Sequence, residues 1–482
     1  EAKQLNKDIF ETIYHASLEE SCELAKKERI VKKGDYVVIT EPYEGFPADK
    51  AGLRAGDKLL EIDGKSVKGK STEDVSSVLK GQPGVEVNVL IERPGTEKPI
   101  KKTFTREEVK VKSVPYKGMV DDGIAYVRLT RFTRNCASEV EDAILELTEE
   151  NDVKGLVLDL RGNPGGLLNE SVSLCNLFID KNQEVVSTKG KIKDWEKSYK
   201  TMKEPLYKEL PLAVLINQSS ASASEIVSGT IQDLDRGVIL GKKSFGKGLV
   251  QQTRKLSYNS QLKVTVAKYY TPSGRCIQAL DYTNKNEDGS VGKVADSLKT
   301  AFKTRNGRTV YDGGGVDPDI VIDQEIFAKI LGSLVSKQLI FDFATEFVLE
   351  NDSIEAPGVF KISDALYEDF VMFLSDKEYE YETNTEKKMA ELIDKAEDEY
   401  ADFKEDLEVL QKKLLSYKKD DIHKYQSQVS ELILSELMAR YYYQEGRVIA
   451  SLANDTVLKE AISVLNDSDR YEAILSGNID DK

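Results

Sequence analysis

Residues 211–234 read PLAVLINQSSASASEIVSGTIQDL, an apolar run that passes through small residues into a helical pattern. The run PLAVLINQ is typical of a strand buried on both faces. Ser222 and Glu225 have the S-x-x-E spacing of a capping box, which predicts that Ser222 caps the following helix. A buried strand that leads directly into a helix is the unit from which α/β cores are built.

The same alternation extends outward on both sides, from about residue 114 to residue 325. GIAYVRLTRF (123–132), VKGLVLDL (153–160) and GVILG (237–241) read as strands. SEVEDAILELTEE (138–150) and LLNESVSLCNLFI (167–179) have the period of helices. This part of the chain is therefore predicted to be a layered, mixed α/β core.

The flanking regions have other patterns. Residues 31–113 consist of short β-rich runs between turn residues, with one helix, STEDVSSVLKG (71–81), that opens on a Ser71–Asp74 capping box. Residues 1–30 and 326–482 read as helical, and a capping box at Thr383 and Glu386 precedes an apolar stripe. The stripe consists of Met389, Leu392, Ile393, Ala396, Tyr400, Phe403, Leu407, Leu410 and Leu414. It indicates either a domain packed on itself or its neighbours, or a helix pair for oligomerisation or partner docking.

Composition excludes several classes of function. The formal net charge of −16 argues against binding to nucleic acid or anionic lipid. Four cysteines without C-x-x-C spacing argue against a structural zinc site, and no phosphate or dinucleotide loop is present, so neither a metal nor a cofactor is predicted. The two histidines, His15 and His423, lie near opposite ends of the chain, so a Ser-His-Asp triad is not expected.

Ser222 is a candidate nucleophile as well as a candidate cap. A serine at a helix start lies among free N–H groups and the positive end of the helix dipole, which suits a developing oxyanion. A serine needs a base, and with histidine excluded the candidate is Lys247 in KKSFGKGLVQQ (242–252), whose flanking glycines permit close packing. In an extended segment Gln251 would share the face of Lys247. The alternative is a surface lysine in a glycine turn.

The loop DLRGNPGGLL (159–168) follows a predicted buried strand, and α/β proteins place their sites in such loops. Gly165 and Gly166 would allow a backbone N–H to approach a ligand as an oxyanion donor. The alternative is an ordinary turn at a helix start. A lysine acts as a base only when it is uncharged, so burial in apolar surroundings is also expected at the site.

In their order, SASASE (220–225), FGKGLVQ (245–251) and LRGNPGG (160–166) resemble the carboxyl-terminal processing proteases, also called tail-specific proteases. The resemblance implies a serine endopeptidase with Ser222 as nucleophile, Lys247 as general base and Gln251 orienting the lysine. It also implies an oxyanion hole formed by the N–H of Ala223 and an N–H of the Gly165–Gly166 turn. Asp233 falls on a position that the family favours.

GFPADKAGLRAGDKLLEIDGKSVKG (45–69) resembles a PDZ domain, and the resemblance as a whole covers residues 31–325. The segment ELAKKERIVKKGDYVVI (23–39) lacks the G-x-G-I stretch that forms the family's peptide-binding edge. The stretches TPSGRCIQALDY (271–282) and YDGGGVDPDI (311–320) and the tyrosine-rich tail are most similar to versions from the Bacteroides group.

The expected organisation is a helical segment (1–30), a PDZ domain (31–113), an α/β serine protease core (114–325) and a C-terminal helical domain (326–482). Protein substrates with apolar C-terminal tails, export to the periplasm or cell envelope, and an adaptor or a second copy on the C-terminal helices are the expectations that accompany the resemblance. Two other functions remain open. One is a PDZ-based binding protein with an inactive core, and the other is a crotonase-like enzyme acting on small acyl substrates.

Overall fold

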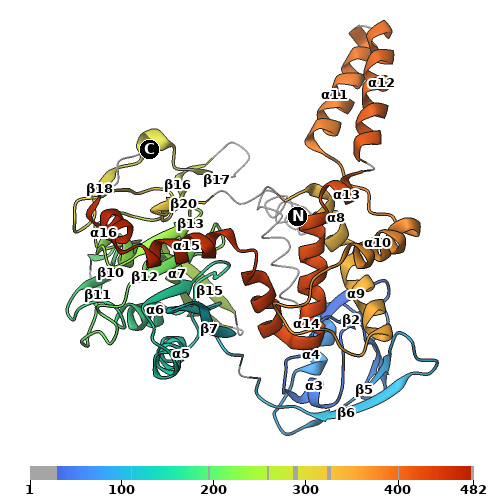
Figure 1. The fold of residues 1–482 in the computed structure, drawn as a ribbon, viewed down its shortest axis with the longest axis horizontal. Coiled ribbons are helices and arrows are strands. Elements are labelled where there is room, and N and C mark those ends of the chain that lie inside the picture. The colour runs from blue at the N-terminus through green and yellow to red at the C-terminus, as the bar shows by residue number, and fades with distance from the viewer. Residues whose placement is uncertain are drawn as a thin grey trace. The chain divides into compact units, whose positions relative to one another are not determined.

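The computed structural model describes residues 30–109, 111–193, 196–257, 260–285, 291–322, 327–399, 401–418 and 420–478 (Figure 1). The predicted helix over residues 1–30 lies outside this range, apart from Ile30. The chain divides into two compact units. The helical unit comprises Glu1–Lys110 and Glu325–Ala453, and the core unit comprises Val111–Gln324 and Asn454–Lys482. Each unit is described by itself below.

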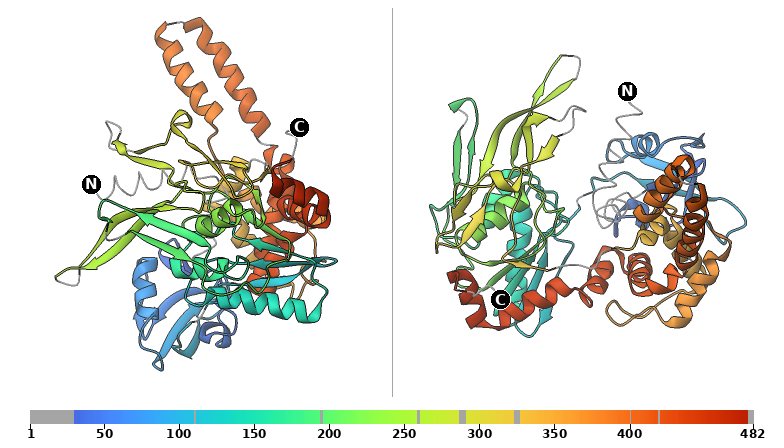
Figure 2. Two further views of the ribbon diagram at one scale, coloured as in Figure 1. Left: turned by 90° about the vertical axis from the view of Figure 1, so that its left-hand side faces the viewer. Right: turned by 90° about the horizontal axis from the view of Figure 1, so that it is seen from above.

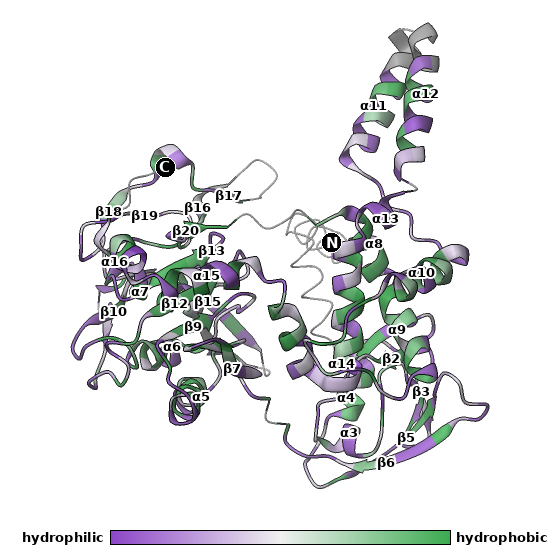
Figure 3. Ribbon diagram, in the orientation of Figure 1, coloured by the Kyte–Doolittle hydropathy of each residue, from purple (hydrophilic) through white to green (hydrophobic). Residues whose placement is uncertain are grey.

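The core unit is built on a mixed sheet with the strand order β20-β13-β12-β9-β8-β7. All neighbouring pairs are parallel except β7 and β8. The strands are β7 (Tyr116–Asp121), β8 (Ile124–Arg128), β9 (Gly155–Asp159), β12 (Leu212–Ile216), β13 (Val238–Gly241) and β20 (Ile320–Val321). The predicted α/β core is confirmed, and Figure 3 shows the hydrophobic strands β9 and β12 at the centre of this sheet.

Both faces of the sheet are covered. Successive side chains of a strand point to opposite faces, and in the central strands all of them are buried. Leu156, Leu158 and Val214 belong to one core cluster with residues of the helices that follow β8, β9 and β12. These helices are α5 (Cys136–Glu150), α6 (Leu168–Cys175) and α7 (Ala223–Asp233). Val157 and Ala213, at the intervening positions, are equally buried.

The helices α15 (Thr456–Asn466) and α16 (Ser468–Ser476) belong to the core unit. The prediction had grouped them with the C-terminal helical domain. Helix α15 contacts β9, β12 and β13, and buries Val457, Ala461 and Val464. The Tyr471 hydroxyl of α16 accepts a 3.0 Å hydrogen bond from the Leu212 N–H at the start of β12. The end of the chain therefore completes the hydrophobic core of the sheet.

A second sheet of the core unit has the order β11-β10-β15-β14, with β14 at its edge. Its strands are β10 (Glu184–Lys189), β11 (Lys197–Lys200), β14 (Leu249–Lys255) and β15 (Gln261–Tyr270). Two hairpins and a 3₁₀ turn complete the unit: β16 (Leu280–Lys285) with β17 (Val291–Lys293), β18 (Ala301–Lys303) with β19 (Thr309–Tyr311), and η2 (Asp296–Leu298). The described cysteines Cys136, Cys175 and Cys276 are not in disulfides.

The N-terminal part of the helical unit is a β-rich domain with the strand order β1-β2-β3-β5-β6. The elements are β1 (Ile30–Lys33), β2 (Tyr36–Ile39), α3 (Pro47–Lys50), β3 (Lys58–Ile62), β4 (Lys65–Ser66), α4 (Thr72–Leu79), β5 (Glu86–Glu92) and β6 (Ile100–Thr105). The predicted capping box is confirmed, since Asp74 N–H donates to Ser71 Oγ at 3.0 Å and Ser71 N–H to the Asp74 carboxylate at 3.3 Å.

The rest of the helical unit is helical, as predicted, and its long helices are seen from two sides in Figure 2. The helices are α8 (Lys329–Ser336), α9 (Leu339–Glu350), α10 (Asp364–Phe373), η3 (Leu374–Asp376), α11 (Asn384–Glu399), α12 (Ala401–Lys418), α13 (Asp421–Lys424) and α14 (Gln426–Leu452). Helices α11 and α12 pack together, with Leu407 buried between them and Leu392 and Leu410 about half exposed. None of the described helices is long and apolar enough to cross a bilayer.

Helix α14 contacts the β-rich domain of its own unit at a break in the helix. Tyr443 has a left-handed φ of 52°, and its hydroxyl donates to the Asp49 carboxylate at 2.7 Å. Gln444 and Arg447 both donate to Glu41. The β-rich domain and the last long helix of the unit are therefore joined by specific polar contacts.

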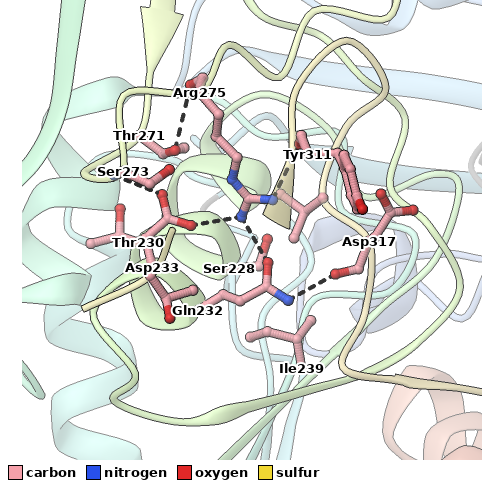
Figure 4. Close-up of polar contacts among 12 residues, drawn as sticks. Ser228, Thr230, Gln232, Asp233, Ile239, Thr271, Ser273, Arg275, Tyr311 and Asp317 are labelled. Carbon is pink, nitrogen blue, oxygen red and sulfur yellow. Dashed lines mark hydrogen bonds and ion pairs between the residues drawn. The ribbon is translucent and has the colours of Figure 1, made fainter. Parts of the chain in front are cut away.

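At the far end of α7, a buried ion pair fixes a loop of the core unit (Figure 4). Arg275 and Asp233 are both fully buried, with 2.8 Å between the Arg275 Nη2 and Asp233 Oδ1 atoms. Arg275 also donates to Gln232, and the second Asp233 oxygen accepts the Ser273 N–H. The position of Asp233 that the resemblance singled out thus holds the 271–276 turn against helix α7.

We expect Asp233→Ala to lower the free energy of unfolding by about 3–5 kcal/mol, because it leaves the Arg275 charge buried without its partner. Urea denaturation of the whole chain measures this loss. Glu146→Ala is the control, since it removes the exposed Lys117–Glu146 pair of the same unit and should cost less than about 1 kcal/mol. Equal losses in the two variants would contradict the structural role of Asp233.

Candidate active site

Three loops meet at one edge of the core sheet because they follow three adjacent parallel strands. The loop 160–167 follows β9, the loop 217–222 follows β12, and the segment 242–248 follows β13. Carboxyl ends of neighbouring parallel strands lie side by side, which is where open α/β sheets bind their ligands. The three motifs that the sequence singled out separately are therefore brought to one place.

Ser222 lies at the start of helix α7 in a strained backbone conformation. Its φ of 55° and ψ of −109° are unusual for a residue with a side chain, and the flanking Ala221 and Ala223 are both buried. The side chain of Ser222 is half-buried. Ala223 is the first residue of the helix, so no carbonyl within α7 accepts its N–H. The turn presents a serine hydroxyl beside an amide donor.

Glu225 connects this turn to the segment that carries Lys247. Its Oε2 atom accepts the Ser222 N–H at 2.8 Å and the Lys247 N–H at 2.9 Å. Its Oε1 atom accepts the Gly246 N–H and the Ser244 hydroxyl, each at 2.6 Å. The carboxyl group is fully buried; burial raises its pKa, and these four hydrogen bonds oppose the rise.

The capping interaction predicted for Ser222 and Glu225 is present through the Ser222 N–H. The sequence motif did not show that the same carboxylate also holds a second segment, Ser244 to Lys247, which lies 19 to 22 residues further along the chain. This additional role of Glu225 requires β12 and β13 to be neighbours, which is a property of the sheet and not of the local pattern.

The backbone around Lys247 is held firmly, while its side chain is exposed. The Gly246 carbonyl accepts the Ala279 N–H at 2.9 Å, and the Gly248 N–H donates to the Gln278 side chain at 2.8 Å. A Cβ at Gly246 would lie 2.3 Å from the Ala279 Cβ, which confirms that the glycines permit close packing. The apolar burial expected for a lysine base is not seen at Lys247.

Gln251 is an exposed residue of the edge strand β14. The strand begins at Leu249, so Lys247 lies outside it. The alternation of side chains along the strand therefore does not place Lys247 on the same face as Gln251. Pairing with β15 shifts register between Val250 and Gln251. Gln251 and Lys247 thus belong to one continuous segment at the edge of the second sheet.

Gly165 lies directly against the Ser222 turn. A Cβ at Gly165 would lie 2.5 Å from the Ala221 carbonyl oxygen and 2.8 Å from the Ala223 nitrogen, so no other residue fits. The Gly165 N–H donates to the Asn163 side chain at 2.9 Å. Within the described residues, the N–H of Gly166 has no such intramolecular acceptor. The turn therefore offers two amides that could stabilise an oxyanion. The Gly165 amide would first have to break its hydrogen bond to the Asn163 side chain.

Asn163 ties this loop to the serine turn. Its backbone carbonyl accepts the Ala221 N–H at 3.0 Å and the Ser224 hydroxyl at 2.9 Å. Its side chain donates to the Leu129 carbonyl, and the residue is fully buried. The position of the glycine turn relative to Ser222 is thus fixed by backbone contacts and by one buried asparagine.

The charged pair at the start of the loop, Asp159 and Arg161, was not assigned a role from the sequence. Asp159 is fully buried and accepts hydrogen bonds from Arg161 and from the Tyr126 hydroxyl. Burial alone would raise the pKa of Asp159, but Arg161 lowers it to about 2. An aspartate at the end of an otherwise apolar strand, followed two residues later by an arginine, is the sequence signal that could have identified this buried pair.

The helical unit contains a groove of about 690 Å³ between β2 and α4. It is largely apolar, and two basic residues, Lys80 and Arg106, line it with Glu41, Glu73 and Glu107. Ser76 and Leu79 of α4 form one wall, and Ile39 of β2 contributes to the other. An extended peptide with an apolar end would fit such a groove by adding to the edge of a sheet.

Comparison with known proteins agrees with this architecture. Residues 123–285 match peptidase family S41, residues 38–93 match the PDZ domain, and residues 330–465 match "Probable PDZ-protease, C-terminal helical domain". The core of this chain is therefore similar to peptidase family S41, and the flanking regions are similar to the PDZ domain and to the helical domain of PDZ-proteases.

Two curated proteins that are similar to this chain are named as proteases. The carboxy-terminal-processing protease of Bartonella bacilliformis is 39% identical over 257 residues, which are 53% of this chain and 58% of that protein. A protein of Staphylococcus aureus named "Probable CtpA-like serine protease" is 39% identical over 249 residues, or 51% of this chain and 49% of its own length. The chain thus spans about half the length of the curated relatives it matches.

Among solved structures, the photosystem II D1 C-terminal processing protease is 30% identical. The matched region covers 64% of this chain and 74% of that one, with a TM-score of 0.34.

We expect Glu225→Gln to loosen the contact between Ser222 and the Lys247 segment. An amide nitrogen cannot accept the N–H groups that one carboxylate oxygen now accepts, so the free energy of unfolding should fall by about 2–4 kcal/mol. The reaction of Ser222 with a fluorophosphonate probe should slow as well. Glu139→Gln, at a carboxylate that accepts the Ser113 and Val114 amides instead, should change stability alone. Unchanged labelling in Glu225→Gln would contradict the bridging role.

Proposed function

We propose that this chain is a serine endopeptidase that cleaves unfolded or loosely folded proteins through an acyl-enzyme formed on Ser222. The observation that carries this proposal is the shared Glu225 oxygen, which holds the amides of Ser222 and Lys247 side by side. The serine turn, the lysine segment and the glycine turn meet there, and the family match of the core supports the reaction class.

In the proposed mechanism, uncharged Lys247 accepts the Ser222 proton as Oγ attacks the scissile carbonyl carbon. The carbonyl electrons move to oxygen, and the oxyanion is stabilised by the Ala223 amide and one amide of the Gly165–Gly166 turn. The C–N bond then breaks, and the leaving amine takes the proton from the lysine. Water attacks the acyl-enzyme with the lysine again as base, and Ser222 recovers its proton.

The exposed position of Lys247 fits this mechanism if the substrate itself provides the burial. The glycines and Glu225 fix the backbone, and in the proposed mechanism rotation of the lysine side chain brings its amine to the serine. A substrate chain lying over the site would exclude water from the amine and favour its neutral form. Gln251, on the adjacent edge strand, is the proposed partner that orients the amine.

Cleavage of an unstructured protein with an apolar C-terminus, followed at pH 8, tests the dyad. We expect Ser222→Ala to abolish cleavage and Lys247→Ala to lower kcat by about 10²–10⁴-fold, as for loss of a general base. Lys243→Ala is the matched control, because Lys243 lies in the same segment but pairs with Asp317. Full activity of Lys247→Ala would exclude the dyad, and activity of Ser222→Ala would exclude this nucleophile.

The groove of the helical unit is the proposed binding site for the C-terminal tail of the substrate. Its apolar lining would hold the last side chains, and Lys80 and Arg106 supply positive charge for the terminal carboxylate. Recruitment by the tail would raise the local concentration of a long substrate at the protease core, whereas a short peptide gains nothing from it.

Ser76→Glu places a negative charge in the groove and should weaken cleavage of a long protein about tenfold without changing cleavage of a short internal peptide. Ser77→Glu is the control, because Ser77 is its exposed neighbour on α4 and does not line the groove. The measurement is KM for both substrates in both variants. Equal effects on the long and short substrates, or equal effects of the two variants, would contradict tail recruitment.

Further parts of the proposal follow the resemblance. We propose export to the periplasm or cell envelope, an origin in the Bacteroides group, and docking of an adaptor or a second copy on the C-terminal helices. The opposing function is that of a PDZ-based binding protein with an inactive core. The Ser222→Ala comparison separates the two functions, because a binding protein would show no cleavage in the parent chain.

A further inference from the structure

The guanidinium group of Arg161, at the start of the glycine loop, is held from two directions by two carboxylates. Asp159 accepts from Nε at 3.0 Å and from Nη2 at 2.7 Å. Asp455 accepts from Nη1 at 2.9 Å and from Nη2 at 2.5 Å. The three side chains are between 0 and 12% exposed, so these pairs are shielded from solvent.

The two carboxylates come from distant parts of the chain. Asp159 ends β9 beside Arg161, whereas Asp455 is the N-cap of α15 and accepts the Leu458 N–H at 3.0 Å. The match to the helical domain of PDZ-proteases continues to residue 465, within α15, although α15 packs on the sheet of the core unit. The last part of the region that matches the helical domain thus packs on the core unit, and its Asp455 carboxylate contacts Arg161 there.

Arg161 is connected to Ser222 by a short series of buried contacts. The next residue, Gly162, donates its N–H to the Asn217 side chain at 2.9 Å. Asn163 then accepts the Ala221 N–H, and Gly165 lies against the Ser222 turn. A movement of Arg161 would therefore displace the amides proposed to stabilise the oxyanion.

We propose that Asp455 is a positioning residue for the glycine loop and acts through Arg161. This inference rests on the proposed peptidase function. A helix cap alone would need only one acceptor oxygen, and asparagine or serine would serve equally well. The second carboxylate oxygen and the bidentate geometry are directed at Arg161, and a charged, bidentate pair fixes orientation more strongly than a neutral hydrogen bond.

Asp455 follows the helical unit closely in the chain. Only Ala453 and Asn454 separate Asp455 from the end of α14. Helix α14 holds Glu41 and Asp49, which flank the residues Pro42, Tyr43 and Phe46 that line the tail-binding groove. The covalent chain therefore leads from the helix that contacts this groove to the side chain that holds the glycine loop.

The test compares Asp455→Asn with Asp467→Asn in the full chain. Asparagine keeps the size and the capping oxygen in both cases. Asp467 caps α16 through the Arg470 N–H and is the matched control, because it has no contact with Arg161. Four quantities are measured: hydrogen exchange of the amides of Gly162, Asn163, Gly165 and Gly166, kcat and KM for a short peptide, and Tm.

We expect Asp455→Asn alone to speed exchange of these amides about tenfold and to lower kcat about tenfold, with KM within twofold of the parent. Its Tm should fall below that of Asp467→Asn, because Arg161 loses one of its two buried carboxylate partners, whereas Asp467 is an exposed cap. Unchanged exchange, faster exchange with unchanged kcat, or equal effects in both variants would each overturn the proposal. If the parent chain cleaves no peptide, the proposed function fails, and the exchange comparison still decides whether Asp455 holds the loop.

Discussion

One carboxylate oxygen, Oε2 of Glu225, determines how the candidate site is assembled. It accepts two backbone amides, one from the serine turn after β12 and one from the lysine segment after β13. The carboxyl group is fully buried, so each donor would lose its partner without access to water if this acceptor were absent. Both segments must therefore keep their positions relative to each other, while the Lys247 side chain is exposed.

The glycine loop depends on a second buried polar group, the Arg161 guanidinium between Asp159 and Asp455. The Glu225 carboxylate and the Arg161 guanidinium are alike in this respect: each is a charged group that is buried and hydrogen-bonded to several partners. Such a charge is costly to bury and more costly to leave unpaired, which makes it better suited to fixing a geometry than to adding stability. In the core unit these two groups hold three loops that would otherwise have the freedom of surface loops.

Much of the fold could be read from local patterns. The β-α alternation, the continuous apolar strands and the capping boxes at Ser71 and Thr383 are properties of neighbouring residues, and the structure has all of them. The dyad and oxyanion residues remain predictions, although their three loops do meet. The packing of α15 on the core sheet could not be read from the sequence, because the pattern of an amphipathic helix does not identify the surface that the helix covers. Tyr400 and the side chains of Ala396 and Phe403 lie outside the described range.

The sequence by itself determined the class of the fold, and its resemblance to a known family predicted the order of the domains and the residues for acyl transfer. It could do so because strand and helix periodicity, capping and motif spacing depend on residues a few positions apart. Only the tertiary structure decided that Glu225 serves two segments, that the Gly165 amide is already engaged, and that Asp455 meets Arg161. The partners in that last contact are 294 residues apart. Such contacts exist only after the sheet has aligned its strands and α15 has covered its second face.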